Sequence, residues 1–103
     1  MRRARVHMLG EPAGILQEEP AGRYLFLYDE EYAGPPISLT MPVRQREFSF
    51  EQFPPFFEGL LPEGVMLEGL LRQNKLDRMD LFSQLLAVGA DMVGAVTVTE
   101  ASP

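Results

Sequence analysis

The spacing of apolar residues changes from a strand pattern to a helix pattern near Pro54 and Pro55, and returns to a strand pattern at residues 94–99. Before these prolines, apolar and polar residues alternate in short runs, which is typical of β-strands. After them, apolar residues recur every three or four positions, as in helices that bury one side. The sequence therefore predicts an α/β protein of the α+β kind. We expect a small, mainly antiparallel sheet of about five strands, packed with about three short helices.

The length of the chain fits one domain, residues 1–103, since compact domains commonly have about 100 to 150 residues. Hydrophobic residues make up 46% of the chain and charged residues 23%. These values are ordinary for globular proteins, so we expect most of the chain to fold around a single core.

Strand patterns predict the layout of the sheet. Residues 3–9 alternate apolar and polar side chains, and residues 15–17 return as the second strand of a hairpin. Residues 23–28 are apolar on both faces, which is typical of a central strand. Prolines delimit a short strand at 37–40, and residues 94–99 alternate again as the last strand.

Helical spacing predicts three helices in the second part of the chain. The first starts at residues 54–55, because proline suits the first turn of a helix, and the second spans residues 63–75. The third has Asp77 as N-cap, Asp80 at the capping-box position and Gly89 as C-cap. The residues expected to face the core are Phe56, Phe57, Leu60, Leu61, Leu67, Leu70, Leu71, Leu81, Leu85 and Val88.

Composition argues against several functional classes. The formal charge of −6 is unfavourable for a nucleic-acid surface, which needs basic groups against phosphates. With no cysteine and with His7 as the only histidine, a zinc site is improbable, and we expect neither a metal nor a cofactor. No stretch approaches the roughly 20 apolar residues that span a bilayer, so we expect no membrane contact and a cytoplasmic location.

Catalytic motifs are absent from the sequence. His7 lies on the expected solvent side of the first strand, far in the sequence from Ser38, Ser49 and Ser83, so it does not suggest a nucleophile and base. The glycines of residues 89–94 lack the lysine and the spacing of a phosphate-binding loop, and turn chemistry explains them better. We expect the chain not to be an enzyme.

Val65 and Met66 are the least ordinary apolar residues. If the leucines of the second helix mark its buried side, a rotation of about 100° per residue turns Val65 to nearly the opposite side and Met66 to the flank. Because they follow the bend at Pro62, they would lie on a protruding helix start that could enter a partner's cleft. Alternatively, another strand or the polar tail covers them. The geometry alone favours neither interpretation.

Four segments resemble one family. The sequence reads YDEEY at 28–32, PISLTMPVR at 36–44, FFEGLLPEG at 56–64 and LFSQLLAVGADMVGAVTV at 81–98. In this order and spacing, the four segments are similar to the N-terminal subdomain of HipA-type serine/threonine kinase toxins. The likeness extends over nearly the whole chain, which makes it more specific than any single motif.

The resemblance implies a function. In HipA-type toxins, several hundred residues of kinase follow this subdomain, whereas this chain starts at Met1 and stops at Pro103, which favours a complete gene product. The chain thus resembles the HipS-type antitoxins of three-gene HipBST systems. That likeness implies binding and inhibition of a HipT-type kinase toxin, with a HipB-like DNA-binding protein as a further expected partner in the same complex. The kinase's nucleotide site, catalytic aspartate and metal ligands would all be absent.

On this basis we expect the turn Pro62–Met66 to enter or abut the kinase cleft, with support from behind by Phe57 and Leu61. The full set of expected partner-binding residues is Phe57, Leu61, Pro62, Glu63, Gly64, Val65 and Met66. Residues 29–31, which are acidic, could steer the encounter, although a solvated turn explains them as well. A second hypothesis makes the chain a structural module that completes a HipA-like kinase or its complex with a HipB-like protein.

Overall fold

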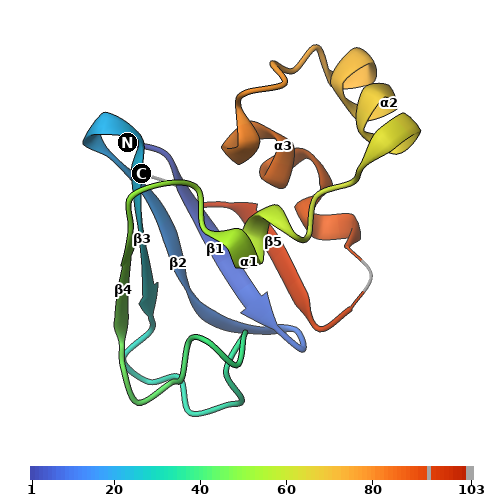
Figure 1. Ribbon diagram of the computed structural model, residues 1–103. Helices are drawn as coiled ribbons and strands as arrows, with labels where there is room; N and C mark the ends of the chain where they lie inside the picture. Colours follow the sequence, from blue (N-terminus) through green and yellow to red (C-terminus); the bar gives the residue numbers. More distant parts are fainter. Residues whose placement is uncertain (93, 102–103) are drawn as a thin grey trace.

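A five-stranded antiparallel sheet forms one layer of the computed structural model, which describes residues 1–92 and 94–101 (Figure 1). The strands are β1 (Arg3–Met8), β2 (Glu11–Glu19), β3 (Arg23–Tyr28), β4 (Glu47–Phe50) and β5 (Val96–Glu100). Their spatial order is β4-β3-β2-β1-β5. Val93 in the predicted 89–94 turn, and Ser102 and Pro103 in the polar tail, lie outside the described residues.

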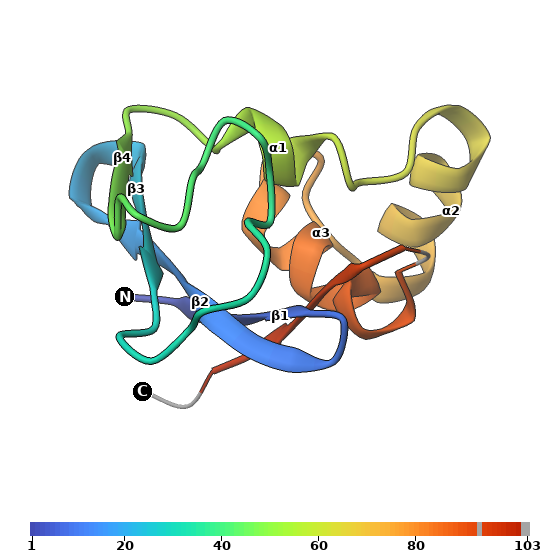
Figure 2. The same ribbon diagram turned by 90° about the horizontal axis from the view of Figure 1, so that it is seen from below.

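Helices form a second layer on one face of the sheet. The helices are α1 (Pro55–Glu58), α2 (Gly64–Asn74) and α3 (Leu81–Val88), with short 3-10 turns η1 (Pro20–Gly22) and η2 (Gly89–Asp91). Helices α1 and α3 lie over the sheet, whereas α2 lies beyond α3 and packs chiefly against it (Figures 1 and 2). The predicted fold class is confirmed.

The hairpin between β1 and β2 is tighter than the sequence predicted. The turn is confined to Leu9 and Gly10, and β2 begins at once with Glu11. Pro12 is accommodated in β2, although proline lacks a backbone N–H, because the β1–β2 register shifts after Val6. The predicted strand at 23–28 is confirmed as β3, which pairs on both sides with β2 and β4.

The strand predicted at residues 37–40 is wrong. Those residues form turns, and the fourth strand is β4, which pairs with β3 through Phe48 opposite Phe26. The Tyr28 hydroxyl fixes the turns: it donates to the Met41 carbonyl oxygen at 2.6 Å and accepts from the Ile37 N–H at 3.0 Å. Nearby prolines at positions 35, 36 and 42 bring no backbone N–H to a strand ladder, which disfavours pairing here.

The helix boundaries also need corrections. Asp80, not Asp77, caps α3, because its carboxylate accepts from the Ser83 N–H at 3.2 Å. Asp77 instead accepts from the Met79 N–H at 2.7 Å in the preceding turn. Helix α1 is only one turn long, so Leu60 and Leu61 follow it rather than belong to it.

The expected buried leucine stripe of α2 is only half-buried. Every residue of α2 is half-buried or exposed, including Leu67, Leu70 and Leu71. The cause is the position of α2, which lies outside the core and packs mainly on α3. In α3, Leu85 is fully buried as predicted, whereas Leu81 and Val88 are half-buried and Phe82 takes the core position.

Aromatic side chains fill the space between the sheet and the helices. The largest fully buried side chains include Phe26 from β3, Phe57 from α1 and Phe82 from α3. The Phe26 and Phe57 ring centroids lie 5.9 Å apart. Burying a phenylalanine side chain stabilises a fold by about 1.5 to 3 kcal/mol, so these residues account for much of the attachment of α1 and α3.

Arg2 ties α3 to the sheet. Its guanidinium donates to Glu18 at 2.7 and 3.0 Å, to Asp80 at 3.1 Å and to the Ser83 hydroxyl at 2.8 Å, and it lies over the Phe82 ring. The hydrogen bond from Arg2 lowers the pKa of Glu18. Burial raises the pKa of Asp80, but hydrogen bonds from Ser83 and Arg2 outweigh it, and the net shift is downward.

Two glycine substitutions should have opposite effects on stability. A Cβ at Gly89 would overlap the Val98 carbonyl, whereas a Cβ at Gly69, inside α2, would meet open space. We expect Gly89→Ala to lower the free energy of unfolding by about 1 to 3 kcal/mol through overpacking. Gly69→Ala should raise it by about 0.5 to 1 kcal/mol through helix propensity. Urea unfolding measures both changes, and equal effects of the two variants would contradict the packing described here.

The Arg2 contacts predict a pH-dependent loss of stability. Because the folded-state pKa values of Glu18 and Asp80 are lowered, their contribution is present above their unfolded values of about 4 and is lost as the pH falls through the folded values. Arg2→Ala should lower the free energy of unfolding at pH 7 by about 1 kcal/mol, because the groups are partly exposed.

Urea unfolding of both proteins at several pH values tests this expectation. The difference between wild type and Arg2→Ala should shrink below about pH 4. Arg78→Ala, which breaks the exposed Arg78–Glu68 pair, is the matched control and should change stability by less than about 0.5 kcal/mol. A difference that is constant with pH would mean that Arg2 acts by packing on Phe82 instead of through the carboxylates.

Candidate partner-binding surface

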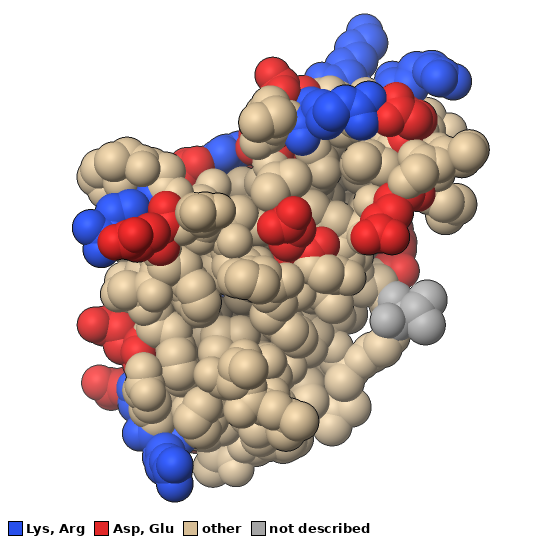
Figure 3. Space-filling view, in the orientation of Figure 1, with Lys and Arg blue, Asp and Glu red and all other residues tan. Residues whose placement is uncertain are grey.

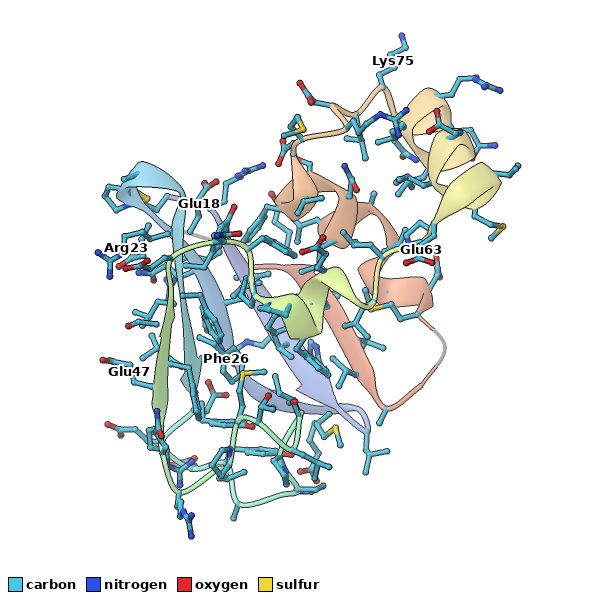
Figure 4. All side chains as sticks on the ribbon, in the orientation of Figure 1. Glu18, Arg23, Phe26, Glu47, Glu63 and Lys75 are labelled. Carbon is cyan, nitrogen blue, oxygen red and sulfur yellow. The ribbon has the colours of Figure 1, made fainter. Side chains whose placement is uncertain are left out.

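The surface seen from the side of α1 is largely uncharged (Figure 3). Basic side chains gather near the end of α2, where Arg72, Lys75 and Arg78 follow one another closely in the chain. At the opposite end of α2, Glu63 extends from the start of the helix (Figure 4). The two ends of α2 therefore present opposite charges.

The segment Pro62–Met66 makes the turn into α2. Glu63 is extended, with φ of −128°, and Gly64 then takes φ of +59°, a left-handed conformation that favours glycine. A Cβ at Gly64 would meet open space, so its backbone conformation rather than close packing requires glycine. The turn lets the chain leave α1 and start a helix outside the core.

Val65 and Met66 project into solvent, as the helical rotation predicted. Their side chains are 88% and 75% exposed. Single exposed apolar residues are common, but two adjacent ones on the first turn of a helix form a small apolar tip. The described residues leave this tip uncovered, so the alternative of a covering strand does not hold for them.

Phe57 and Leu61 precede this segment in the chain. Phe57 is fully buried in the core, and Leu61 is half-buried in the connection to α2. The Leu61 N–H donates to the Glu58 carbonyl oxygen at 3.1 Å, which continues the α1 turn toward Pro62. Phe57 therefore anchors the segment and offers no surface of its own to a partner.

A groove runs between α2 and α3, with a volume of about 760 Å³. Val65 and Met66 stand on its α2 side, and Asp91 of η2 is its one charged lining residue in the described part of the chain. The remaining lining residues are Leu60, Pro62, Gly69, Leu70, Gln73, Asn74, Ala87, Val88 and Met92. The sequence did not predict this groove, because it depends on how two helices are placed; the glycine inside α2 was the available signal.

The acidic residues 29–31 differ in their surroundings. The Asp29 carboxylate accepts from the Arg5 guanidinium at 2.7 Å, so its charge is partly neutralised. Glu30 and Glu31 are exposed beside an open depression that Glu11 also lines. Among residues 29–31, Glu30 and Glu31 form no ion pair with the described residues. Their role in steering a partner remains a prediction.

Catalytic groups do not come together in the described residues. His7 is half-buried on the open face of the sheet, opposite Thr97 and Pro12, while Ser83 bonds to Asp80 and Arg2. The same residues hold no group of three or more histidine, cysteine or acidic side chains suited to a metal ion. None of the described helices is both long and apolar enough to cross a membrane.

Comparison with known proteins identifies the family. A family model described as the HipA N-terminal domain matches residues 4–99. The chain belongs to this family. The solved structure of the N-terminal domain of a HipA toxin superimposes with a TM-score of 0.78 at 30% identity, covering 99% of this chain and 94% of that one. The HipA-type resemblance seen in the four sequence segments is thereby confirmed.

Two relatives place the domain in different settings. An uncharacterized protein of Haemophilus influenzae is 35% identical over 100 residues, which cover 97% of this chain and 93% of that protein. The putative kinase Y4dM of Sinorhizobium fredii is 33% identical over 103 residues, which cover 90% of this chain but 25% of the kinase. The region similar to this chain thus makes up nearly the whole of one relative and a quarter of the other, a putative kinase.

Proposed function

We propose that this chain is a HipS-like antitoxin that binds and inhibits a HipT-type serine/threonine kinase in a HipBST system. The exposed apolar tip of Val65 and Met66 carries the proposal, because it offers a partner contact that the chain itself does not use. The Haemophilus relative supports it, since that protein consists almost wholly of the same domain.

The proposed mechanism is physical obstruction. Phosphoryl transfer needs the phosphate-binding and catalytic loops of a kinase to be ordered around ATP and its metal ions. A small domain that inserts the Pro62–Met66 turn between such loops holds them apart without taking part in chemistry. Phe57 and Leu61 fix the base of the turn, while Val65 and Met66 make the contact.

A HipB-like protein would supply DNA binding in the same complex. With a net charge of −6, this chain is unsuited to phosphate contacts of its own. In this proposal, this chain regulates the kinase and the HipB-like protein binds DNA.

The second candidate is an assembly module that completes a HipA-like kinase. The Sinorhizobium protein favours it, because there the same domain makes up a quarter of a putative kinase. The two candidates differ in sign: an antitoxin lowers kinase activity, whereas an assembly module raises or preserves it.

Titration of the purified chain into a HipT-type kinase tests the proposal. We expect phosphate transfer to fall to a plateau near equal stoichiometry. Val65→Asp should weaken inhibition at least about tenfold, since it places a charge in an apolar contact. Its thermal unfolding should match the wild type, because Val65 is 88% exposed.

Leu39→Asp is the matched control. Leu39 is 96% exposed in the connection between β3 and β4, at the other end of the molecule from α2 (Figure 1). This variant should inhibit like the wild type. Full inhibition by folded Val65→Asp would refute the contact site, and a gain of activity with the wild-type chain would refute the antitoxin role in favour of assembly.

A further inference from the structure

The groove between α2 and α3 adjoins the apolar tip, because Val65 and Met66 also line the groove. Val65 and Met66 lie at the start of its α2 wall, and Ala87 and Val88 of α3 form the facing wall. Its volume of about 760 Å³ lies in the usual range of binding pockets, about 300 to 1,000 Å³. It has room for several side chains, more than a contact with the tip alone would use.

Gly69 keeps the groove open. It lies inside α2, where glycine disfavours the helix, and a Cβ there would meet nothing within 4 Å. The backbone of α2 is therefore accessible along the groove, and a partner segment could approach it closely. A larger residue at this position would occupy the space that glycine leaves.

The charge at the groove is acidic. Asp91 lines it, and Glu63, the N-cap of α2, is not a lining residue but stands in the chain between the lining residues Pro62 and Val65 (Figure 4). In the described part of the chain, neither carboxylate forms an ion pair, since the pairs there use Glu18, Asp80, Asp29 and Glu68. Lysine and arginine are absent from the described lining residues, although Arg72 and Lys75 flank the lining residues Gln73 and Asn74 at the end of α2. The part of the groove at Asp91 therefore suits a positive charge on the occupant.

From these features we infer that the groove receives a segment of the kinase itself, one with apolar side chains followed by a lysine or arginine. The apolar side chains lie between α2 and α3, and the basic residue pairs with Asp91, with Glu63 adding negative charge where the chain enters α2. This inference rests on the proposed function and deepens it: the tip and the groove form one continuous binding surface for a single partner.

Gly69→Leu tests the groove directly. The leucine side chain fills it and also favours the helix, so the thermal unfolding temperature should stay the same or rise. We expect its affinity for the HipT-type kinase to fall at least tenfold in calorimetric titration. Gly69→Ala, which adds one methyl group, should weaken binding by less than Gly69→Leu does. Leu39→Asp, at an exposed position outside the groove, is the control and should bind like the wild type.

Charge reversal tests the acidic end. Glu63→Lys and Asp91→Lys should each weaken binding by about three- to tenfold at low salt, and the difference should shrink at 0.5 M salt. Glu47→Lys, on the opposite edge of the sheet, should bind like the wild type (Figure 4).

The outcomes separate this inference from the proposed function. If Val65→Asp loses binding while folded Gly69→Leu binds normally, the groove inference fails and the contact through the tip stands. If the wild-type chain does not bind the kinase, the proposed function itself fails. If Gly69→Leu instead abolishes self-association in sedimentation, the occupant is a second copy of the chain and the inference is overturned.

Discussion

Packing of Phe57 against Phe26 and of Phe82 against Tyr24 is the interaction on which the rest of this structure depends. These rings place α1 and α3 on one face of a sheet that is only five strands wide, and together the two helices cover it. Helix α2 is therefore left to pack on α3 from outside, with all its residues half-buried or exposed. The exposed tip and the groove are consequences of how the core is filled.

The two walls of the groove are held with different strength. Helix α3 is fixed by Arg2, which bonds to its N-cap Asp80, and by Gly89, which lies directly against Val98 of β5. Helix α2 is attached through its half-buried leucines and the exposed Arg78–Glu68 pair. Exposed ion pairs contribute little, so α2 is the wall that can adjust to a partner.

Much of the fold was predictable because the decisive patterns are local. Alternation located β1 and β5, a run that is apolar on both faces located β3, and the helical spacing after Pro55 located α1 and α2 to within a few residues. Strand β4 was missed, because the fourth strand was expected at 37–40, although Phe48 and Phe50 alternate with polar residues in β4.

One part of the candidate site was predictable from the local sequence, and the other part was not. The exposure of Val65 followed from the 100° rotation of a helix, which needs only the local sequence. The groove did not follow, because it depends on the distance between α2 and α3, and Leu70 was assigned to the core although it lines the groove.

We would first record methyl-group NMR spectra of this chain, deuterated except at its methyl groups, bound to a protonated, unlabelled kinase, because cross-saturation reports which methyl groups touch a partner. We predict strong loss of methyl signal at the tip and the groove, namely at Val65, Met66, Leu70, Val88 and Met92. Effects confined instead to Ile15, Leu25 and Leu27, which lie on the sheet face away from the helices, would contradict it.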